Sequence, residues 1–211
     1  DNLITRAAKL LKKQTSCMLG CDITLNKHIS IGGGFGGGSS NAATTLLALN
    51  QLWGLFLSIN ELSKMGHQLG ADVPIFIHGN SAWGEGIGEK LTPMILPQRW
   101  FVIISPKCGV ETATLFADPD LCRSNAPMNP LHYQPGQGHN DFQAIVLKKY
   151  PQITEALLWL QQHGQARLTG TGSGVFAAFD KADQAGRIAH LAPPSWDVRV
   201  ACGLNHSPLH A

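Results

Sequence analysis

A run of glycines before a predicted helix is the feature of the sequence with the clearest chemistry. Glycine fills six of the seven positions 32–38, two serines and an asparagine follow, and residues 42–53 are rich in alanine and leucine. Glycine allows positive φ values and close approach of a ligand to the main chain. The first N–H groups of a helix lack intrahelical acceptors, and the helix dipole adds positive charge there. The pattern therefore predicts a cradle for phosphate oxygens. Its predicted residues are Gly32, Gly33, Gly34, Phe35, Gly36, Gly37, Gly38, Ser39, Ser40 and Asn41.

A linker or a plain turn accounts for the glycine run less well than a phosphate cradle does. A linker would mix glycine and serine on both sides, a turn needs only one or two glycines, and ordering so many glycines costs entropy. Gly32, Gly34 and Gly37 satisfy the dinucleotide pattern GxGxxG, but no acidic residue for the ribose lies between Asn41 and Asn60. The run contains no lysine, so it is not a Walker A loop.

The first half of the chain must position this cradle. We expect a helix capped by Asp1 and reaching Lys13, and a strand over residues 22–26, whose apolar positions alternate. Ser58 and Glu61 have the spacing of a capping box, which predicts a helix that ends at Gly70.

Asp72 is predicted to lie at a corner between a helix and a strand. Pro74 disfavours the helical conformation for Val73, so short strands are expected over 75–77 and 81–85. A domain boundary is expected near Pro97.

The second half alternates predicted helices and strands, so the fold class is α+β. Strands are expected over 100–105 and 198–201, and a strand, glycine-rich turn and strand over 167–179; helices are expected over 112–117, 140–149, 152–163 and 181–191; and residues 124–138 are expected to form a loop.

Composition excludes several classes of protein. The net charge is +2 and no run of Lys or Arg exceeds a pair, which argues against nucleic acid and anionic membranes as partners. Five cysteines without a CxxC pair indicate free thiols, and we expect a cytoplasmic location. Neither a histidine spacing typical of metal sites nor a GxSxG motif occurs, so no side-chain metal site and no serine hydrolase are expected.

Four segments together resemble the GHMP small-molecule kinases. They are GGGFGGGSSNAAT (32–44), LGADVP (69–74), LTGTGSGVF (168–176) and NHSPLH (205–210), and their order and spacing fit along nearly all of the chain. The resemblance implies a GHMP kinase fold of two domains. Residues 1–97 would be a ribosomal protein S5 domain 2-like nucleotide-binding domain without its first strands, and residues 98–211 a ferredoxin-like substrate domain.

The same resemblance implies a reaction. The γ-phosphoryl group of ATP, with Mg²⁺, would pass to a hydroxyl of a small molecule. The last three segments resemble the branch whose acceptor is a cytidine diphosphate ester of methylerythritol, in non-mevalonate isoprenoid precursor biosynthesis. Two alternatives stay open: another GHMP small-molecule kinase, or a non-catalytic nucleotide-binding protein. A monomer or a homodimer is expected.

Family positions also imply roles for residues outside the glycine run. Asp72 would be the catalytic aspartate, although a polar residue at a turn explains it equally well without the family. Asn2 and Lys27 would lie beside the nucleotide base; a first-turn helix residue and a solvated lysine are the alternatives. Thr112 and Phe116 would contact the substrate, with Phe116 stacked on cytosine or, alternatively, in the core.

The second glycine-rich turn is expected to brace the glycine run or to border the substrate. Its residues are Thr169, Gly170, Thr171 and Gly172. In relatives, Ala-Cys often stands where this chain has Ser173-Gly174.

One family motif has no counterpart in these 211 residues. Family members carry an earlier lysine on a strand, followed by a Tyr-His pair that grips cytosine. The chain begins at Asp1 without a methionine. We therefore expect a chain that lacks its N-terminal part, with little or no kinase activity in the 211-residue form.

Overall fold

The computed structural model describes residues 2–29, 32–123, 128–134 and 136–210. These residues form two compact units. Unit 1 comprises residues 1–27, 36–96 and 204–211, and unit 2 comprises 28–35 and 97–203. The chain thus passes from unit 2 to unit 1 inside the glycine run, between Phe35 and Gly36. A domain boundary at residue 97 stays a prediction.

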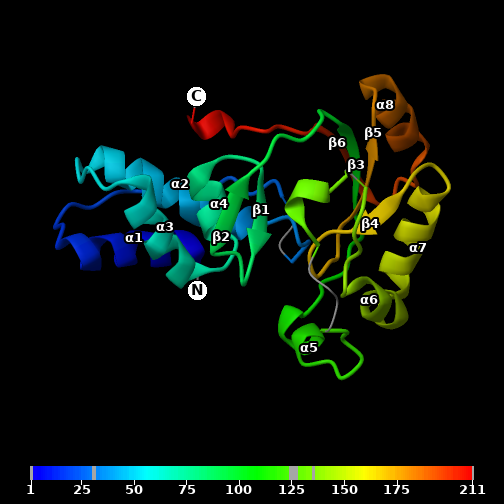
Figure 1. Cartoon of the computed structure of the whole chain (residues 1–211), viewed down its shortest axis with the longest axis horizontal. Coiled ribbons are helices and arrows are strands. Elements are labelled where there is room, and N and C mark those ends of the chain that lie inside the picture. Colours follow the sequence, from blue (N-terminus) through cyan, green and yellow to red (C-terminus); the bar gives the residue numbers. More distant parts are fainter. Residues whose placement is uncertain (1, 30–31, 124–127, 135, 211) are drawn as a thin grey trace. The chain divides into compact units, whose positions relative to one another are not determined.

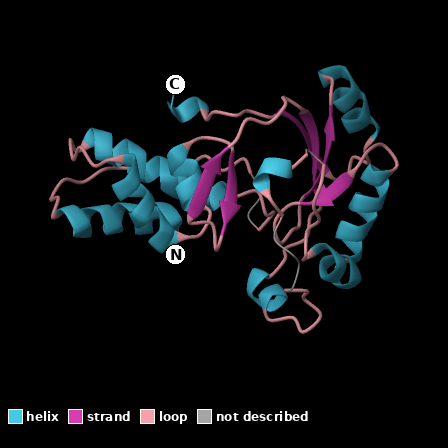
Figure 2. Cartoon of the chain, viewed as in Figure 1, coloured by secondary structure: helices cyan, strands magenta, loops and turns pink. Residues whose placement is uncertain are grey.

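Unit 1 consists of helices and one hairpin (Figure 2). Its elements are α1 (Leu3–Thr15), α2 (Gly37–Leu52), α3 (Ile59–Leu69), α4 (Val73–His78), β1 (Ala82–Glu85), β2 (Lys90–Pro93) and the 3₁₀ turn η2 (Pro208–His210). Helix α2 packs against the other three helices, and Leu11, Leu46 and Ile77 are fully buried in their common core.

The helix starts in unit 1 follow the sequence signals in part. Ser58 and Glu61 form the expected capping box, and α3 ends before Gly70. The cap of α1 is Asn2, whose side chain accepts a hydrogen bond from the amide of Ile4. The expected cap, Asp1, lies outside the described residues.

Two strand predictions in unit 1 are wrong. Residues 22–26 are not a strand, because no neighbouring segment among the described residues supplies ladder hydrogen bonds. Residues 75–77 belong to helix α4, not to a strand. Pro74 lies in the first turn of that helix, where a proline costs no hydrogen bond, and Val73 is helical in spite of it. Asp72 therefore lies between two helices.

Unit 2 is an antiparallel sheet with helices on one face. Its strands are β3 (Trp100–Ser105), β4 (Ala166–Leu168), β5 (Val175–Phe179) and β6 (Asp197–Cys202), in the order β4-β5-β3-β6. The helical elements are α5 (Thr112–Phe116), η1 (Pro130–His132), α6 (Gln143–Lys149), α7 (Pro151–Gln161) and α8 (Ala182–Leu191). Both α7 and α8 pack on this sheet and lie on the same face (Figure 1). A sheet with this strand order and its two crossovers is ferredoxin-like.

The strand predictions for unit 2 are confirmed, because alternating or continuous apolar runs specify these strands locally. In β5, Val175, Ala177 and Phe179 are buried and the two residues between them are partly exposed. The expected loop over 124–138 falls partly outside the described residues; its described part contains η1. Among the described residues no helix combines the length and the apolar character needed to cross a membrane.

Candidate functional site

The N-terminus of α2 presents polar groups that have no protein partner among the described residues. The amides of Gly37, Gly38 and Ser39 have no acceptor there, whereas the amide of Ser40 donates to the carbonyl oxygen of Gly36 at 2.9 Å. The hydroxyls of Ser39 and Ser40 are likewise unpaired within the described part of the chain. Three N–H groups and two hydroxyls are therefore available to an anion.

Two glycines at this helix start lie close to side chains of neighbouring helices. Gly36 has a φ of 66°, and a Cβ on it would lie 2.9 Å from Cζ of Phe76 on α4. A Cβ on Gly38 would lie 3.3 Å from Leu3 on α1. A Cβ on Gly36 would thus force the ring of Phe76 to shift, and a Cβ on Gly38 would require a smaller shift of Leu3.

The corner that carries Asp72 lies beside the same helix end. A Cβ on Gly70 would be 4.0 Å from the Ser39 hydroxyl oxygen, and the amide of Val73 donates to the carbonyl of Gly70. Asp72 is exposed, and its carboxylate has no hydrogen bond or ion pair within the described ranges. Unit 1 therefore places the corner that carries Asp72 beside a helix end whose N–H groups are available to an anion.

The turn of the β1–β2 hairpin presses against this corner. Gly88 has a φ of 101°, and a Cβ on it would lie 2.8 Å from the carbonyl oxygen of Ala71. Gly88 is not among the site residues predicted from the sequence. Its signal is the GEGIGE segment over 84–89, whose glycines mark the turn but not what it packs against.

The first part of the glycine run is held by the second glycine-rich turn, inside unit 2. Gly33 accepts hydrogen bonds at its carbonyl from the Thr169 hydroxyl (2.9 Å) and the Gly174 amide (3.0 Å). Gly32 accepts one from the Ser173 amide at 3.2 Å. The turn therefore braces the glycine run, which is one of the two roles expected for it.

Close packing explains why glycines occupy both sides of this contact. A Cβ on Gly34 would lie 2.4 Å from the carbonyl oxygen of Thr169, and one on Gly174 would lie 2.3 Å from the ring of Phe35. Phe35 also covers Gly33, where a Cβ would lie 2.5 Å from the ring. Its ring is a packing element of the loop.

The predicted substrate residues of unit 2 also lie together. The hydroxyl oxygens of Thr112 and Thr171 are 3.0 Å apart and share a hydrogen bond. Phe116 is 57% exposed, so it is not a core aromatic, and its ring meets that of Phe142 edge-on with centroids 4.9 Å apart. Gly170 accepts a hydrogen bond at its carbonyl from the side-chain amide of Asn140, at 2.7 Å.

Asn140 and Phe142 belong to this group, although the sequence did not mark them as site residues. The Asn140 amide group also donates to Leu168, and its side-chain oxygen accepts from the Phe142 amide at 2.9 Å. An asparagine shortly before a helix, here three residues before α6, is the typical signal of such a turn. Its second contact, with the distant Gly170, leaves no local signal.

The two residues expected beside a nucleotide base lie in unit 1. Asn2 caps α1 and lines a hollow of about 280 Å³ together with Cys21, Ile23 and Leu25. Lys27 is exposed and is not among the residues that line this hollow. Asn2 is thus a helix cap and Lys27 a solvated lysine, and the place of both beside a base stays a prediction.

A second hollow, of about 350 Å³, lies in unit 2 around Cys108. Ser105, Lys107, Ser173 and Asp197 are among its other lining residues. Burial raises the pKa of the Cys108 thiol above its ordinary value of 9.0. The thiol is therefore neutral at pH 7 and unsuited to nucleophilic chemistry.

Comparison with known proteins identifies the family. Residues 2–80 match the GHMP kinases N terminal domain, and residues 126–191 match the GHMP kinases C terminal domain. A 4-diphosphocytidyl-2-C-methyl-D-erythritol kinase from Ralstonia pickettii is 49% identical over 99% of this chain and 74% of that protein. The chain belongs to the GHMP kinases. A kinase of the same name from Histophilus somni is 51% identical over the whole chain and 67% of that protein.

Solved structures agree with this GHMP kinase assignment. The crystal structure of a 4-(cytidine 5'-diphospho)-2C-methyl-D-erythritol kinase aligns with a TM-score of 0.82 and 28% identity, covering 96% of this chain and 78% of that one. A homoserine kinase structure aligns with a TM-score of 0.66 at 15% identity, which shows the fold alone. The expected α+β GHMP kinase fold is confirmed, and the chain is an ATP-dependent small-molecule kinase by family.

Proposed function

We propose that this GHMP kinase transfers the γ-phosphoryl group of ATP to a hydroxyl of 4-diphosphocytidyl-2-C-methyl-D-erythritol, a step in isoprenoid precursor biosynthesis. One observation carries the proposal: the unpaired N-terminal groups of α2 and the free carboxylate of Asp72 lie at one corner of unit 1. Phosphoryl transfer to a hydroxyl needs both an anion cradle and a proton acceptor. The names of relatives at 49% and 51% identity support this acceptor.

The residues of the cradle suit a triphosphate. The amides of Gly37, Gly38 and Ser39 would donate to phosphate oxygens, and the dipole of the 16-residue helix α2 favours their charge. ATP would supply the phosphoryl group. The hollow beside Asn2 is proposed to hold its base, and the exposed Lys27 is proposed to contact the same nucleotide.

Mg²⁺ is proposed as the accompanying ion. Among the described residues, no group of three or more His, Cys, Asp or Glu side chains is arranged to hold a metal. Mg²⁺ often keeps several waters and uses one or two protein ligands plus substrate phosphates. The hydroxyls of Ser39 and Ser40 fit that demand, since both are unpaired in the described structure.

Asp72 is proposed to orient the acceptor hydroxyl and take its proton. An exposed carboxylate without a protein partner can meet a substrate hydroxyl directly. In unit 2, the exposed ring of Phe116 would stack on the cytosine, and the paired hydroxyls of Thr112 and Thr171 would border the same substrate. The turn residues Thr169, Gly170 and Gly172 would hold this surface.

The biological setting is proposed from chemistry. The partner is the small-molecule substrate, with no nucleic acid or membrane involved, and the protein acts as a monomer or homodimer. None of the five cysteines, all of which lie in the described part of the chain, forms a disulfide, which suits the reducing cytoplasm. Residues 1–97 would provide the nucleotide-binding domain and residues 98–211 the substrate domain.

The test is ADP release by the natural gene product, measured with ATP and the cytidine acceptor. Asp72→Asn should lower kcat by about 10²–10⁴-fold and leave the KM for ATP and the free energy of unfolding unchanged, because the exposed side chain has no hydrogen bond or ion pair within the described residues. Asp22→Asn, at another exposed aspartate of unit 1, is the matched control.

Three outcomes would contradict the proposal. An Asp72→Asn enzyme with normal kcat removes the catalytic carboxylate from the mechanism. Faster turnover of mevalonate or homoserine than of the cytidine acceptor would favour another kinase of the family. ATP binding without ADP release from any acceptor would favour a non-catalytic nucleotide-binding protein.

A further inference from the structure

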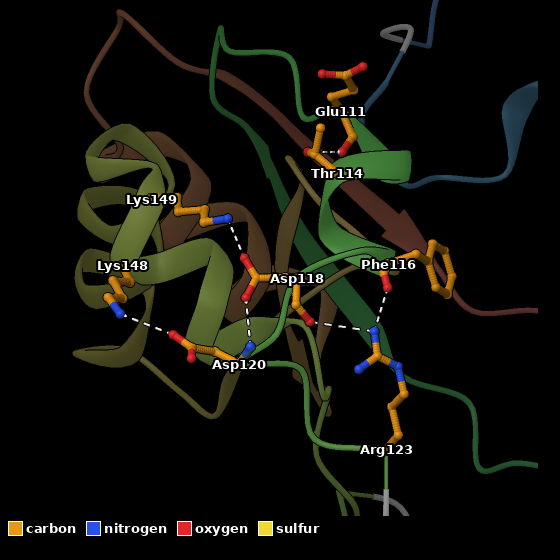
Figure 3. Close-up of polar contacts among 8 residues, drawn as sticks. All are labelled: Glu111, Thr114, Phe116, Asp118, Asp120, Arg123, Lys148 and Lys149. Carbon is orange, nitrogen blue, oxygen red and sulfur yellow. Dashed lines mark hydrogen bonds and ion pairs between the residues drawn. The ribbon is translucent and has the colours of Figure 1, made fainter.

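The loop that follows α5 is organised around the guanidinium of Arg123 (Figure 3). This group donates hydrogen bonds to three main-chain carbonyls, those of Phe116, Asp118 (3.4 Å) and Leu121 (3.3 Å). The last carbonyls of a helix have no intrahelical donors. Arg123 thus supplies a donor to the carbonyl at the end of α5 and fixes the path of the chain that leaves it.

A second anchor ties the same loop to helix α6. The buried carboxylate of Asp118 accepts hydrogen bonds from the Lys149 ammonium and, at 2.9 Å, from the amide of Asp120. The Lys149 hydrogen bond, followed by that of the Asp120 amide, lowers the pKa of Asp118 below its ordinary 3.8. The hydrogen bond to Asp118 raises the pKa of Lys149. Both groups are therefore charged near neutral pH.

The ring of Phe116 is the exposed end of this arrangement. Its carbonyl oxygen faces Arg123, while its ring points away from the charged groups (Figure 3). Phe142, the residue before α6, supports the ring edge-on at 4.9 Å, and the ring stays 57% exposed. Arg123 thus fixes the main chain of Phe116 and Phe142 supports its ring. The exposed part of the ring stays open to a planar ligand.

We propose that Arg123 is a positioning residue for recognition of the acceptor's nucleobase, acting through Phe116. The inference rests on the proposed function, in which Phe116 stacks on cytosine. A planar guanidinium with five donors can hold several carbonyls at once, whereas a lysine ammonium is a compact charge on a flexible stem. Arg123 does not touch the base; it sets the main chain from which the stacking ring projects.

The experiment uses the natural gene product and measures its binding of cytidine 5'-diphosphate by calorimetry, together with its KM values for the cytidine acceptor and for ATP. We expect Arg123→Gln to weaken binding and to raise the KM for the cytidine acceptor by about tenfold, because charge-assisted hydrogen bonds are lost. The kcat and the KM for ATP should not change. Lys148→Gln is the control, since it breaks an exposed ion pair of the same loop, with Asp120, and leaves the Phe116 carbonyl untouched.

A double-mutant cycle separates positioning from general stabilisation. In a Phe116→Leu background, Arg123→Gln should cause no further loss of cytidine diphosphate binding. Arg123→Lys keeps the positive charge and replaces Arg123→Gln in the test if the glutamine variant does not fold. It should still weaken cytidine diphosphate binding several-fold.

Each contrary outcome has a distinct meaning. Additive losses in the cycle, an equal rise in both KM values, or full binding by Arg123→Lys would overturn the positioning role. Absence of cytidine diphosphate binding by the unmodified protein would overturn the proposed function together with this inference. Tight binding by that protein, unaffected by Arg123→Gln, would overturn the inference and leave the proposed function intact.

Discussion

Gly34→Ala should destabilise unit 2 far more than the same change two residues earlier. Gly34 and Gly32 have nearly equal φ values, 72° and 74°. A Cβ on Gly34 would lie 2.4 Å from the Thr169 carbonyl oxygen and 2.9 Å from that of Gly172, whereas a Cβ on Gly32 would have no heavy atom within 4 Å. Comparison of the two variants therefore separates the free-energy cost of an alanine at positive φ, which both share, from the cost of the close contacts, which only Gly34→Ala has.

The expected magnitudes follow from these geometries. An alanine at positive φ costs about 1–2 kcal/mol in either variant. Two of the three atoms that a Cβ on Gly34 would meet are main-chain carbonyl oxygens, which cannot rotate away, so overpacking adds about 1–3 kcal/mol. We therefore expect Gly34→Ala to lose about 2 kcal/mol more than Gly32→Ala, a further fall in Tm of about 4–8 °C for a chain of this size.

Urea unfolding followed by tryptophan fluorescence measures the difference. Binding of a non-hydrolysable ATP analogue gives a second readout, because movement of the Thr169 turn would disturb the carbonyl contacts of Gly33. Gly34→Ala should weaken that binding, and Gly32→Ala should have a smaller effect. Equal losses of stability in the two variants would refute the reasoning that the turn packs tightly on the glycine run.

Three further predictions concern side-chain anchors. Asn140→Ala should cost about 1–3 kcal/mol in urea unfolding, because two carbonyls of the second glycine-rich turn lose their donor; an unchanged midpoint would contradict it. Asn205→Ala should cost a similar amount, about 1–3 kcal/mol, because its side chain bonds both the amide and the carbonyl of Leu96 at 2.8 Å, and Tm measures the loss. Folding lowers the pKa of Asp118, so its contribution to the free energy of unfolding is complete above pH 3.8 and is lost as the pH falls through the folded pKa. Folding raises the pKa of Lys149, so its contribution is lost as the pH rises through a folded pKa above 10.5. The unfolding free energy of Asp118→Asn should accordingly vary less with pH in the acid range than that of the unchanged chain, and parallel curves would contradict the assignment.

Local sequence signals determined much of the fold. The capping box at Ser58 and Glu61 needs only residues three apart, and the apolar run 100–105 needs only its own side chains to specify a buried strand. The glycine run before α2 likewise indicates an anion site from the properties of one helix end. The capping box and the strand are confirmed, since neighbours along the chain supply their physical causes, and the anion site stays a prediction.

The failures occurred where distant neighbours decide the conformation. Residues 22–26 alternate like a strand, but the described residues offer them no partner for a ladder. Val73 precedes a proline and is nevertheless helical, because burial of Val73 and Ile77 against α2 and α3 favours helix α4 over the local preference.

By itself, then, the sequence determined the family, and it predicted the glycine cradle and Asp72 as the candidate catalytic residue. Only the tertiary structure decided that Thr169 holds Gly33, that the ring of Phe116 is exposed and that Arg123 fixes its main chain. The reason is physical: a motif is a property of adjacent residues, whereas a hydrogen bond between positions 33 and 169 exists only after the chain has folded.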